Sequence, residues 1–315
     1  MQKISGIERI TDNLYMIPGE GTATFPFCHS YLYNNDDFCI IFDPQCGRKQ
    51  LKQAFDQIGK TFADLDIIIN THFHLDHSGS NFFLKKISGA KILIHEADAI
   101  ALEHLDAYIE RYGMENKEME KDWRTFLKNF GFKEIIPDQT LKDGDIVPGD
   151  FQVVHTPGHA PGHCCFYKAG ILISGDIDLT SPWIGNLSCN IADYLNSIEK
   201  LKKFRIIKLL PAHGLPVFEN IPERLEAFQH RLLDRVEKTY NLLTDTPLSL
   251  DQITQLMFHE YPEEQRNRLR RRQAQFTFHF GKITCLNHLK YLKIQNRVKN
   301  ITHDGQELWQ KLNSD

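Results

Sequence analysis

One short run of this sequence carries four side chains of the types that bind metal ions: His72-Phe73-His74-Leu75-Asp76-His77. His72 and His74 lie two residues apart, so both project to the same side of an extended chain. Three imidazoles and one carboxylate are borderline ligands that suit Zn²⁺ or Fe²⁺. A single histidine is far more often a packed or surface residue than a ligand. Four ligand-type residues at this spacing reverse that expectation and predict a metal site.

Three later segments each consist of an apolar strand followed by a turn. They read VVHTPGH, ILISGD and IKLLPAHG, and they end in or contain one further ligand-type residue each: His159, Asp176 and His213. A strand followed by a turn places its next side chain at the edge of a sheet, where open α/β sheets tend to hold their sites. Each strand is therefore expected to bring one more candidate ligand to the site.

The elements that must position these residues alternate between strands and helices. Short β-branched or apolar runs bounded by turn residues predict strands at 30–33, 38–42, 66–70, 91–95, 151–155, 164–167, 171–174 and 206–210. Helical spacing of apolar residues predicts helices at 49–58, 98–112, 120–130 and 191–204. The first two thirds of the chain are therefore expected to form a mixed α/β fold.

The composition changes after His213-Gly214. A long amphipathic helix is predicted from Pro222 to Leu243, with proline at its start, and Ser249 is the expected N-cap of the next helix. Further helices are predicted at 263–275 and 284–292, and two short strands at 298–302 and 307–310 flank the turn His303-Asp304-Gly305. Helices that end in a hairpin suggest a winged-helix-like module. We therefore expect two domains: 1–220, catalytic, and 221–315, helical and winged-helix-like.

Composition limits the class of protein. The chain has 315 residues, 41% of them hydrophobic and 25% charged, which is typical of a globular protein with a sizeable core. The N-terminus lacks the continuous apolar stretch of a secretory signal, and no later segment is apolar enough to span a membrane. Seven cysteines without a C-x-x-C pair indicate neither a disulfide framework nor a thiolate zinc site. We expect a soluble protein of the cytoplasm with no membrane partner.

The order of the motifs adds a family resemblance. H-x-H-x-D-H at 72–77, followed by T-P-G-H, S-G-D and P-x-H-G, resembles the metallo-β-lactamase superfamily, in particular its glyoxalase II-like branch. The resemblance extends from about Ile10 to Gly214, and the distal helices resemble the winged-helix domain appended to some members, including an endoribonuclease subgroup. It implies an α/β fold of four layers, an αββα sandwich in which two mixed sheets pack face to face with helices outside and the site at one edge.

The resemblance also implies how the candidate ligands are divided. One metal ion would be held by His72, His74 and His159, the other by Asp76, His77 and His213, with Asp176 between them. The ions would be divalent, most often Zn, with Fe or Mn as alternatives. Two such ions about 3.5–4 Å apart share a water and lower its pKa towards neutrality, so the nucleophile would be metal-bound hydroxide. Asp76 would orient the hydroxide and pass its proton to the leaving group.

Several functions are compatible with this ligand set. The leading interpretation is hydrolysis of an ester-like bond, a thioester or a lactone, in a small-molecule substrate. The second is endonucleolytic cleavage of single-stranded RNA, motivated by the distal helices and by eleven Lys/Arg against five Asp/Glu from Tyr261 onward. A mononuclear iron sulfur dioxygenase would need only three of the histidines. A non-catalytic binding module would be expected to have lost a ligand, and none is missing. The sequence does not fix the oligomeric state.

β-Lactamase activity is disfavoured, because the motif keeps a histidine at its last position, His77, and because no export signal would bring the enzyme to the drug. The Arg266–Arg272 run could contact phosphates or form a solvated helix face.

Weaker signals surround these motifs. Asp43 follows a predicted strand and matches a family position that supports a ligand histidine, although a simple Asp-Pro turn would explain it equally. We expect structural or supporting roles for His155 and His163.

The adjacent Cys164 and Cys165 face opposite ways without a paired base, which favours buried packing over a thiol nucleophile. The Gly-flanked aromatic residues of 19–27 and 181–185 either line a substrate pocket or pack within their loops.

Overall fold

The structure, a computed structural model, describes residues 6–19, 26–259 and 274–312, and its strands form three sheets within that range. The first sheet has the strand order β1 to β7, as in the sequence: β1 (Glu8–Arg9), β2 (Leu14–Ile17), β3 (Ser30–Asn34), β4 (Cys39–Phe42), β5 (Ile67–Ile69), β6 (Lys91–His95) and β7 (Gln139–Leu141). Strands β1 to β4 pair antiparallel, whereas β4 to β7 pair parallel. The sheet is therefore mixed.

The second sheet faces the first and has the order β12-β11-β10-β9-β8. Its strands are β8 (Ile146–Val147), β9 (Phe151–His155), β10 (Cys164–Lys168), β11 (Ile171–Gly175) and β12 (Lys208–Pro211). All its pairs are antiparallel except β11 with β12. Because the crossover to a parallel neighbour needs a long connection, the chain passes through α7 (Ile191–Leu201) between β11 and β12.

Side chains that alternate between the two faces of each strand form the core between the two sheets. In β4, Ile40 and Phe42 belong to the inter-sheet core, and Phe42 packs against Phe151 and Phe166 of the second sheet with ring centroids 5.1 and 5.2 Å apart. Ile41, between them, points to the opposite face and joins a separate cluster with helix residues. Side chains of a strand point alternately to the two faces, so each strand of the first sheet contributes to two layers.

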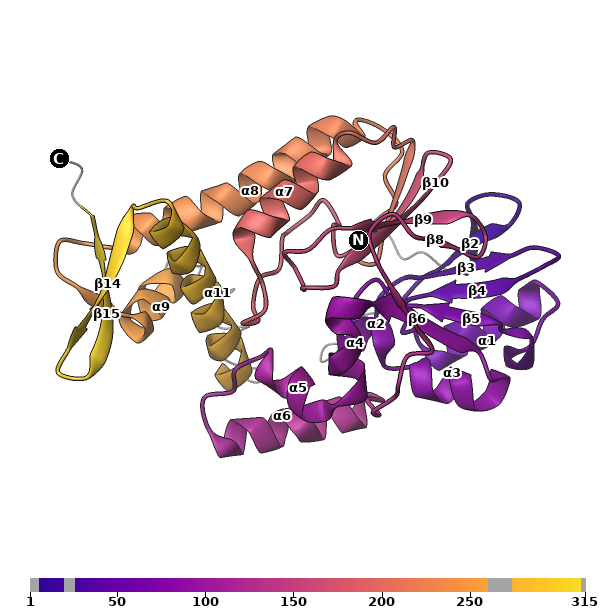
Figure 1. Cartoon of the computed structure of the whole chain (residues 1–315), viewed down its shortest axis with the longest axis horizontal. Coiled ribbons are helices and arrows are strands. Elements are labelled where there is room, and N and C mark those ends of the chain that lie inside the picture. The colour runs from indigo at the N-terminus through magenta and orange to yellow at the C-terminus, as the bar shows by residue number, and fades with distance from the viewer. Residues whose placement is uncertain (1–5, 20–25, 260–273, 313–315) are drawn as a thin grey trace.

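Helices cover both outer faces. On the first sheet lie α1 (Arg48–Gln57) and α3 (Asn81–Ser88), whose buried residues Leu51, Phe55 and Leu84 share a cluster with Ile41. The second sheet is covered by α7 and α8 (Ile221–Leu242), as Figure 1 shows. The predicted four-layer αββα fold is therefore confirmed.

The C-terminal region has the local structure that its sequence predicts. Ser249 caps α9 (Leu250–His259) in a reciprocal pair: Gln252 N–H donates to Ser249 Oγ at 3.2 Å, and Ser249 N–H donates to Gln252 Oε1 at 2.8 Å. Strands β14 (Val298–His303) and β15 (Gln306–Lys311) form the predicted hairpin, to which β13 (Leu248–Ser249) is added at the other edge of β15. Its turn residues Asp304 and Gly305 both have positive φ, as two-residue hairpin turns require.

One apolar cluster connects this region to the second sheet. It includes Leu225, Phe228, Leu232 and Val236 of α8, together with residues of α7 and of α11 (Ala274–Ile294). The division into domains at residue 220 and the winged-helix assignment stay predictions. No helix in the described parts of the chain is long and apolar enough to cross a membrane.

Several boundaries differ from the sequence prediction. The helix expected at 98–112 is broken into α4 (Glu96–Glu103) and α5 (Leu105–Glu110), because His104 is extended at φ −133° and the N–H of Leu105 donates to Glu134 instead. The helix expected at 120–130 begins earlier, as α6 (Lys117–Asn129), with Asn116 as its N-cap.

The short strands β1, β2, β7 and β8 and the helices α2 (Leu75–Ser78) and α3 were not predicted. The helix expected at 284–292 is the longer α11, and most of the helix expected at 263–275 lies outside the described residues.

Candidate metal centre and substrate cavity

All seven candidate ligands lie at one edge of the two sheets, beyond the ends of β5, β9, β11 and β12. The run that follows β5 places His72 and His74 in extended chain and then enters α2, which carries Asp76 and His77. The remaining three follow the ends of the second-sheet strands. The described residues contain two groups with ligand atoms within 4.8 Å of one another: His72, His74, His159 and Asp176 in one, and Asp76, His77 and His213 in the other.

Two glycines allow the loops to approach this edge. Gly158 has φ +133°, and a Cβ there would lie 2.4 Å from the backbone of Tyr194. Gly175 has φ +53°, and a Cβ there would lie 2.6 Å from His163 Nε2 and 3.0 Å from Thr71. Glycine is the residue that adopts these conformations without a steric penalty. The glycines of the T-P-G-H and S-G-D motifs therefore serve the placement of the ligands that follow them.

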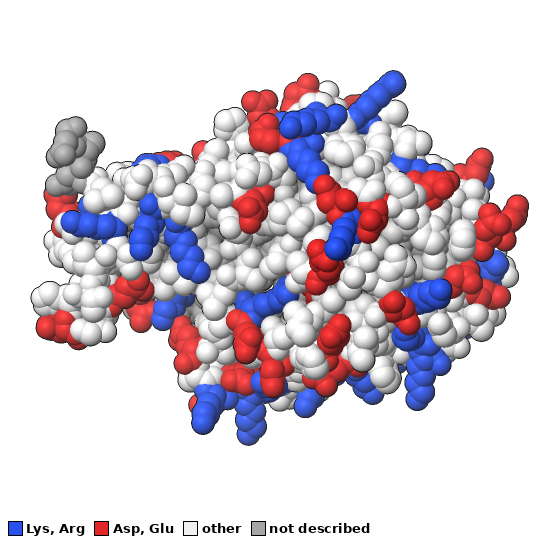
Figure 2. Space-filling view, in the orientation of Figure 1, with Lys and Arg blue, Asp and Glu red and all other residues white. Residues whose placement is uncertain are grey.

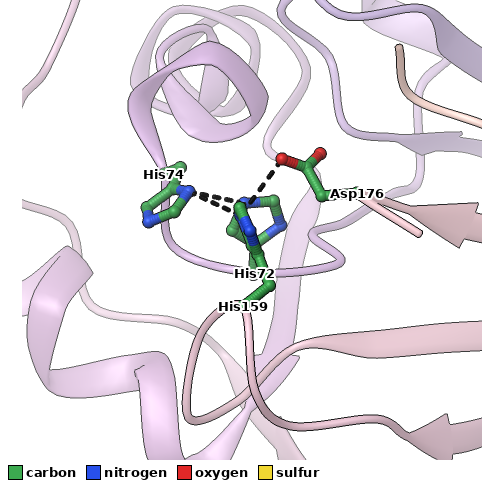
Figure 3. A group of neighbouring side chains, drawn as sticks. All are labelled: His72, His74, His159 and Asp176. Atoms are coloured by element: carbon green, nitrogen blue, oxygen red, sulfur yellow. Dashed lines mark hydrogen bonds and ion pairs between the residues drawn. The ribbon is translucent and has the colours of Figure 1, made fainter. Parts of the chain in front are cut away.

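The first group forms a tight triangle of ring nitrogens, shown in Figure 3. His72 Nε2 lies 2.9 Å from His74 Nδ1, and His159 Nε2 lies 3.1 Å from the former and 3.0 Å from the latter. Nitrogens bound to one Zn²⁺ at about 2.0–2.1 Å would lie about 2.9–3.4 Å apart for bond angles of about 90–109°. The spacing of the three nitrogens therefore fits a shared divalent ion.

Asp176 connects the two groups through its two oxygens. Its Oδ2 lies 3.1 Å from His159 Nε2, whereas its Oδ1 lies 3.0 Å from His77 Nε2 and 3.6 Å from His213 Nε2. The second group is completed by Asp76, whose Oδ2 lies 3.1 Å from His213 Nε2. Asp176 Oδ1 and His77 Nε2 are both buried without a hydrogen-bond partner. The two atoms are as close as an ion pair yet share no hydrogen bond and have no other hydrogen-bond partner, a deficit that a bound metal ion would satisfy.

Asp43 fixes which nitrogen of two histidines faces the site. Its carboxylate accepts hydrogen bonds from the N–H and the hydroxyl of Thr71, at 2.8 and 2.7 Å, and from His77 Nδ1 at 2.9 Å. Because the Thr71 hydroxyl donates to Asp43, its oxygen accepts from His72 Nδ1, 2.9 Å away. In its neutral form, each of these two histidines therefore presents the lone pair of Nε2 to the centre. Of the two interpretations open for Asp43, the structure favours support of a candidate ligand histidine, His77.

His163 supports the candidate site through the backbone of Asp176. Its Nε2 accepts the backbone N–H of Asp176 at 3.1 Å, and its Nδ1 lies 2.8 Å from Thr156 Oγ1. Burial lowers the pKa of His163 to about 3, so the neutral ring can accept this bond at neutral pH. His155 lies farther out, stacked on His95 with centroids 3.9 Å apart. Both have the structural roles expected from the sequence.

Asp98 is a supporting residue that sequence reasoning missed. It is fully buried and accepts hydrogen bonds from the N–H groups of Phe73, at 3.2 Å, and Gly162, at 3.0 Å, while Arg111 Nη1 pairs with it at 2.5 Å. It therefore joins the loop of His72–His77 to the loop of His159. The sequence offered one weak signal for Asp98, its position a few residues after a predicted strand. Its hydrogen-bond partners could not be predicted, because they lie 13 to 64 residues away along the chain.

Charge at the centre is set by burial and by the opposing ligands. Burial and the neighbouring imidazoles hold the pKa of His72 and of His74 well below 6.5, so both rings are neutral. For His77 the effect of burial is outweighed by Asp43, Asp176 and Asp76, which raise its pKa well above 6.5. Burial would raise the pKa of Asp176, but His159, His77 and His213 hold it well below 3.8. The carboxylates of the second group therefore favour positive charge on its histidines. A metal ion would supply that charge in place of the histidine protons.

The two adjacent cysteines do not take part. Cys164 and Cys165 are fully buried, and burial raises the pKa of Cys165 to about 12 and that of Cys164 well above 9. Their thiols are therefore protonated and unreactive at neutral pH. Packing, as expected from the sequence, is the role that the structure supports.

A cavity of about 380 Å³ opens beside the ligands. Five of them line it, together with Asp178, Ser181, three smaller apolar residues and a set of six aromatic side chains that we call the aromatic wall: Tyr108, Tyr112, Trp123, Phe126, Trp183 and Phe280. Of the two glycine-flanked loops, 181–185 contributes Ser181 and Trp183, whereas 19–27 contributes Pro26 and otherwise lies mostly outside the described residues. The Arg266–Arg272 run also lies outside them.

The C-terminal helix α11 reaches this cavity and the loop beneath it. Phe280 lines the cavity, and Asn287, which is buried, donates from Nδ2 to the carbonyls of Ile184 and Asn186 at 3.0 and 2.8 Å. Asn186 Nδ2 in turn lies 3.0 Å from His74 Nε2. Figure 1 shows α11 extending from the C-terminal sheet towards α5 and α6. Neither asparagine carried a signal in the sequence, because both act through residues that are distant along the chain.

Comparison with known proteins is consistent with this geometry. A sequence model described as the Metallo-beta-lactamase superfamily matches residues 23–213. The chain is 28% identical over 206 residues to hydroxyacylglutathione hydrolase GloC of Haemophilus influenzae, covering 63% of this chain and 85% of that protein. It is 23% identical over 273 residues to the Beta-lactamase-like protein 2 homolog of Drosophila melanogaster, covering 84% and 86%.

A solved structure extends the similarity in fold. A metallo-beta-lactamase family protein from Thermus thermophilus superposes with a TM-score of 0.73 at 22% identity, covering 96% of this chain and 100% of that one. At this identity the similarity concerns the fold.

Proposed function

We propose that this chain, which belongs to the metallo-β-lactamase superfamily and is a metal-dependent hydrolase of that family, holds two divalent metal ions. We propose further that it cleaves a thioester or a lactone. The observation that carries the proposal is the division of the Asp176 oxygens, Oδ2 towards His159 and Oδ1 towards His77 and His213. A carboxylate in this position can bridge two ions. The similarity to a hydroxyacylglutathione hydrolase supports an ester-like substrate of small size.

The proposed ligands are those that the sequence predicts. His72, His74 and His159 would hold one ion, Asp76, His77 and His213 the other, and Asp176 both. Nitrogen and carboxylate donors of this kind suit Zn²⁺ first, with Fe and Mn as alternatives. When bound, two such ions lower the pKa of a shared water towards neutrality and polarise the carbonyl under attack.

The chain's own residues would then control orientation and proton transfer. Asp43 and Thr71 keep the Nε2 atoms of His72 and His77 directed at the centre. Asp76 lines the cavity, with its Oδ2 3.1 Å from His213 Nε2, so its carboxylate is placed to orient the attacking water and to carry a proton to the leaving group.

Cleavage of single-stranded RNA receives less support. The described residues that line the cavity include no Lys or Arg to pair with phosphates. Figure 2 shows basic and acidic side chains interspersed over the face in view, where a polyanion would be repelled as well as attracted. A mononuclear iron oxygenase is also less favoured, because the second ligand group is complete.

Location within the cell is part of the proposal. All seven cysteines are free and buried, which supports a reducing, cytoplasmic environment.

Metal analysis joined to a substrate panel tests the proposed function. We expect about two divalent ions per chain and chelator-sensitive hydrolysis of thioesters or lactones by the wild type, with both lost in His74→Ala. His230→Ala, which alters an exposed histidine of α8, is the matched control. Full hydrolysis by a metal-depleted His74→Ala protein would rule out the mechanism. Cleavage of RNA or phosphodiesters in place of thioesters and lactones would replace the substrate class.

A further inference from the structure

The cavity beside the metal centre combines two surfaces of opposite polarity. The centre contributes His74, Asp76, His159, Asp176 and His213, whereas the rest of the lining is mostly apolar. A cavity of about 380 Å³ is larger than the two metal ions and a scissile group require. The space beside the aromatic wall is therefore large enough for another part of the substrate.

The aromatic wall is continuous. Ring centroids of Tyr112 and Trp123 lie 5.2 Å apart, and those of Trp123 and Phe280 lie 5.4 Å apart. Trp183 lies 6.0 Å from Phe280 and 5.4 Å from His74. These contacts form a continuous and mainly apolar surface, which begins at a candidate metal ligand, ends on α6 and carries the Tyr112 hydroxyl and the unpaired Trp123 ring N–H as its polar groups. A group attached close to the scissile bond would therefore lie against rings along its length.

Away from the metal centre, the described residues of the cavity offer no cation that could pair with an anionic substituent. The lining holds no Lys or Arg, and Asp178 adds a further carboxylate. Nearby guanidinium groups already have other partners. Arg111 is paired with the buried Asp98, while Arg231 and Arg235 donate to the carbonyls of Leu179 and Pro182. A substrate carboxylate held against the aromatic wall, away from the metal centre, would lose its hydration without gaining a Lys or Arg counter-charge.

From these observations, and resting on the proposed hydrolysis of a thioester or lactone, we propose that the substrate carries a bulky, uncharged apolar group, alkyl or aryl, next to the scissile bond. This group lies against the aromatic wall. Phe280 of α11 is then a specificity-determining residue, contributed by the C-terminal region to a cavity whose ligands all precede residue 214.

A thioester series measures this directly. N-acetylcysteamine thioesters of acetyl, hexanoyl and adipoyl groups share one neutral leaving group and differ in the acyl part. We expect kcat/KM to rise ~10–100-fold from acetyl to hexanoyl, because each fully buried methylene contributes a factor of up to about four. Adipoyl, of equal length but with a terminal carboxylate, should fall below hexanoyl at least ~10-fold. A second arm with acetyl thioesters of hexanethiol and ethanethiol shows whether the apolar group belongs to the thiol.

Variants of the wall connect the preference to the structure. Phe280→Ala should lower the hexanoyl-to-acetyl ratio by ~5–10-fold, and Phe280→Lys should shift preference towards adipoyl. Phe218→Ala, which removes a half-exposed aromatic ring outside the cavity, should keep the wild-type ratio. Phe126→Ala on α6 provides a second alteration of the wall if the Phe280 variants fail to fold, as judged by thermal unfolding.

The outcomes separate this proposal from the proposed function. Equal rates across the neutral series in both arms, or a preference for adipoyl, would overturn the apolar-group assignment while leaving thioester hydrolysis in place. A metal-loaded protein that hydrolyses none of the thioesters or lactones would instead overturn the proposed function.

Discussion

The two sides of the cavity are built in opposite ways. At the metal centre, seven polar side chains come from short segments at strand ends, and buried partners such as Asp43, Asp98 and His163 orient them. The aromatic wall comes from α5 and the turn after it, from α6 and α11, and from the loop of Trp183, and its side chains are held mainly by ring contacts.

This difference separates chemistry from selectivity. Hydrogen bonds to Thr71 and Asp43 orient His72 and His77, so a small change in these partners should disturb the centre strongly. Ring packing tolerates substitution of similar volume, so changes in the wall should alter which substrate is preferred more than whether hydrolysis occurs. Three alterations test this contrast and a fourth tests the stability of α11, from the largest expected effect to the smallest.

The most severe change should be Asp176→Ala. Its carboxylate faces both ligand groups, so we expect the loss of both ions and a fall in kcat/KM of at least ~10³-fold. Metal content by mass spectrometry and the hydrolysis rate are the measurements. Asp193→Ala, an alteration of an Asp on α7 outside both groups, is the control. Retention of two ions by Asp176→Ala would show that Asp176 does not bridge them.

Asp43→Asn should weaken the centre without abolishing it. The amide can still accept from His77 or Thr71 but not from all three of the present donors, so the orientation of the two ring nitrogens is less fixed. We expect metal affinity to fall by ~10–100-fold, measured by competition with a chelator. Unchanged affinity would mean that the ligands are oriented by packing, and the contrast between the two sides would then fail.

Asn287→Ala asks whether α11 supports the metal centre as well as the wall. It removes two buried hydrogen bonds to the loop that carries Trp183 and Asn186, so we expect about 1–3 kcal/mol lower stability to urea. The rate should fall several-fold for acetyl and hexanoyl substrates alike, unlike Phe280→Ala. Asn241→Ala, at an exposed asparagine of α8, is the control. A loss restricted to hexanoyl would assign Asn287 to the wall alone.

The smallest effect at neutral pH should come from His288→Gln on α11, an alteration that is expected to change how stability depends on pH. Burial and Arg235 lower its folded pKa to about 3, and Thr239 Oγ1 lies 2.7 Å from its Nδ1. Because the unfolded pKa is about 6.5, only the unfolded chain gains a proton as the pH falls, so the stability present above pH 6.5 is lost below it. At pH 5 the loss is about 2 kcal/mol.

Urea unfolding of wild type and His288→Gln at pH 7.5 and 5 checks this expectation. The variant should show a shallower loss of stability on acidification, whereas His230→Gln, at an exposed histidine, should follow the wild type. An equal loss in the His288→Gln protein would show that other groups control the acid sensitivity of this region.

Much of the fold could be predicted, because the signals are local. The strands that deliver the ligands, the helix beginning at Pro222, the Ser249 cap and the turn at Asp304-Gly305 each depend on residues a few positions apart. The break at His104 could not be predicted, because its cause is a contact with Glu134, about thirty residues away. Short edge strands such as β1 and β8 carry too few residues to show a period.

By itself the sequence determined the family and the candidate ligands of this protein: ligand-type residues at fixed spacing within 72–77, and one more after each of three strands. Only the tertiary structure decided how Asp176 divides its oxygens, which carboxylates orient the histidines, and that Phe280 and Asn287 reach the site. The physical reason is distance along the chain. Ligand identity is a local property of residues, whereas cavity shape and polarity arise where segments more than a hundred residues apart pack together, as Asn287 does with Ile184 and Asn186.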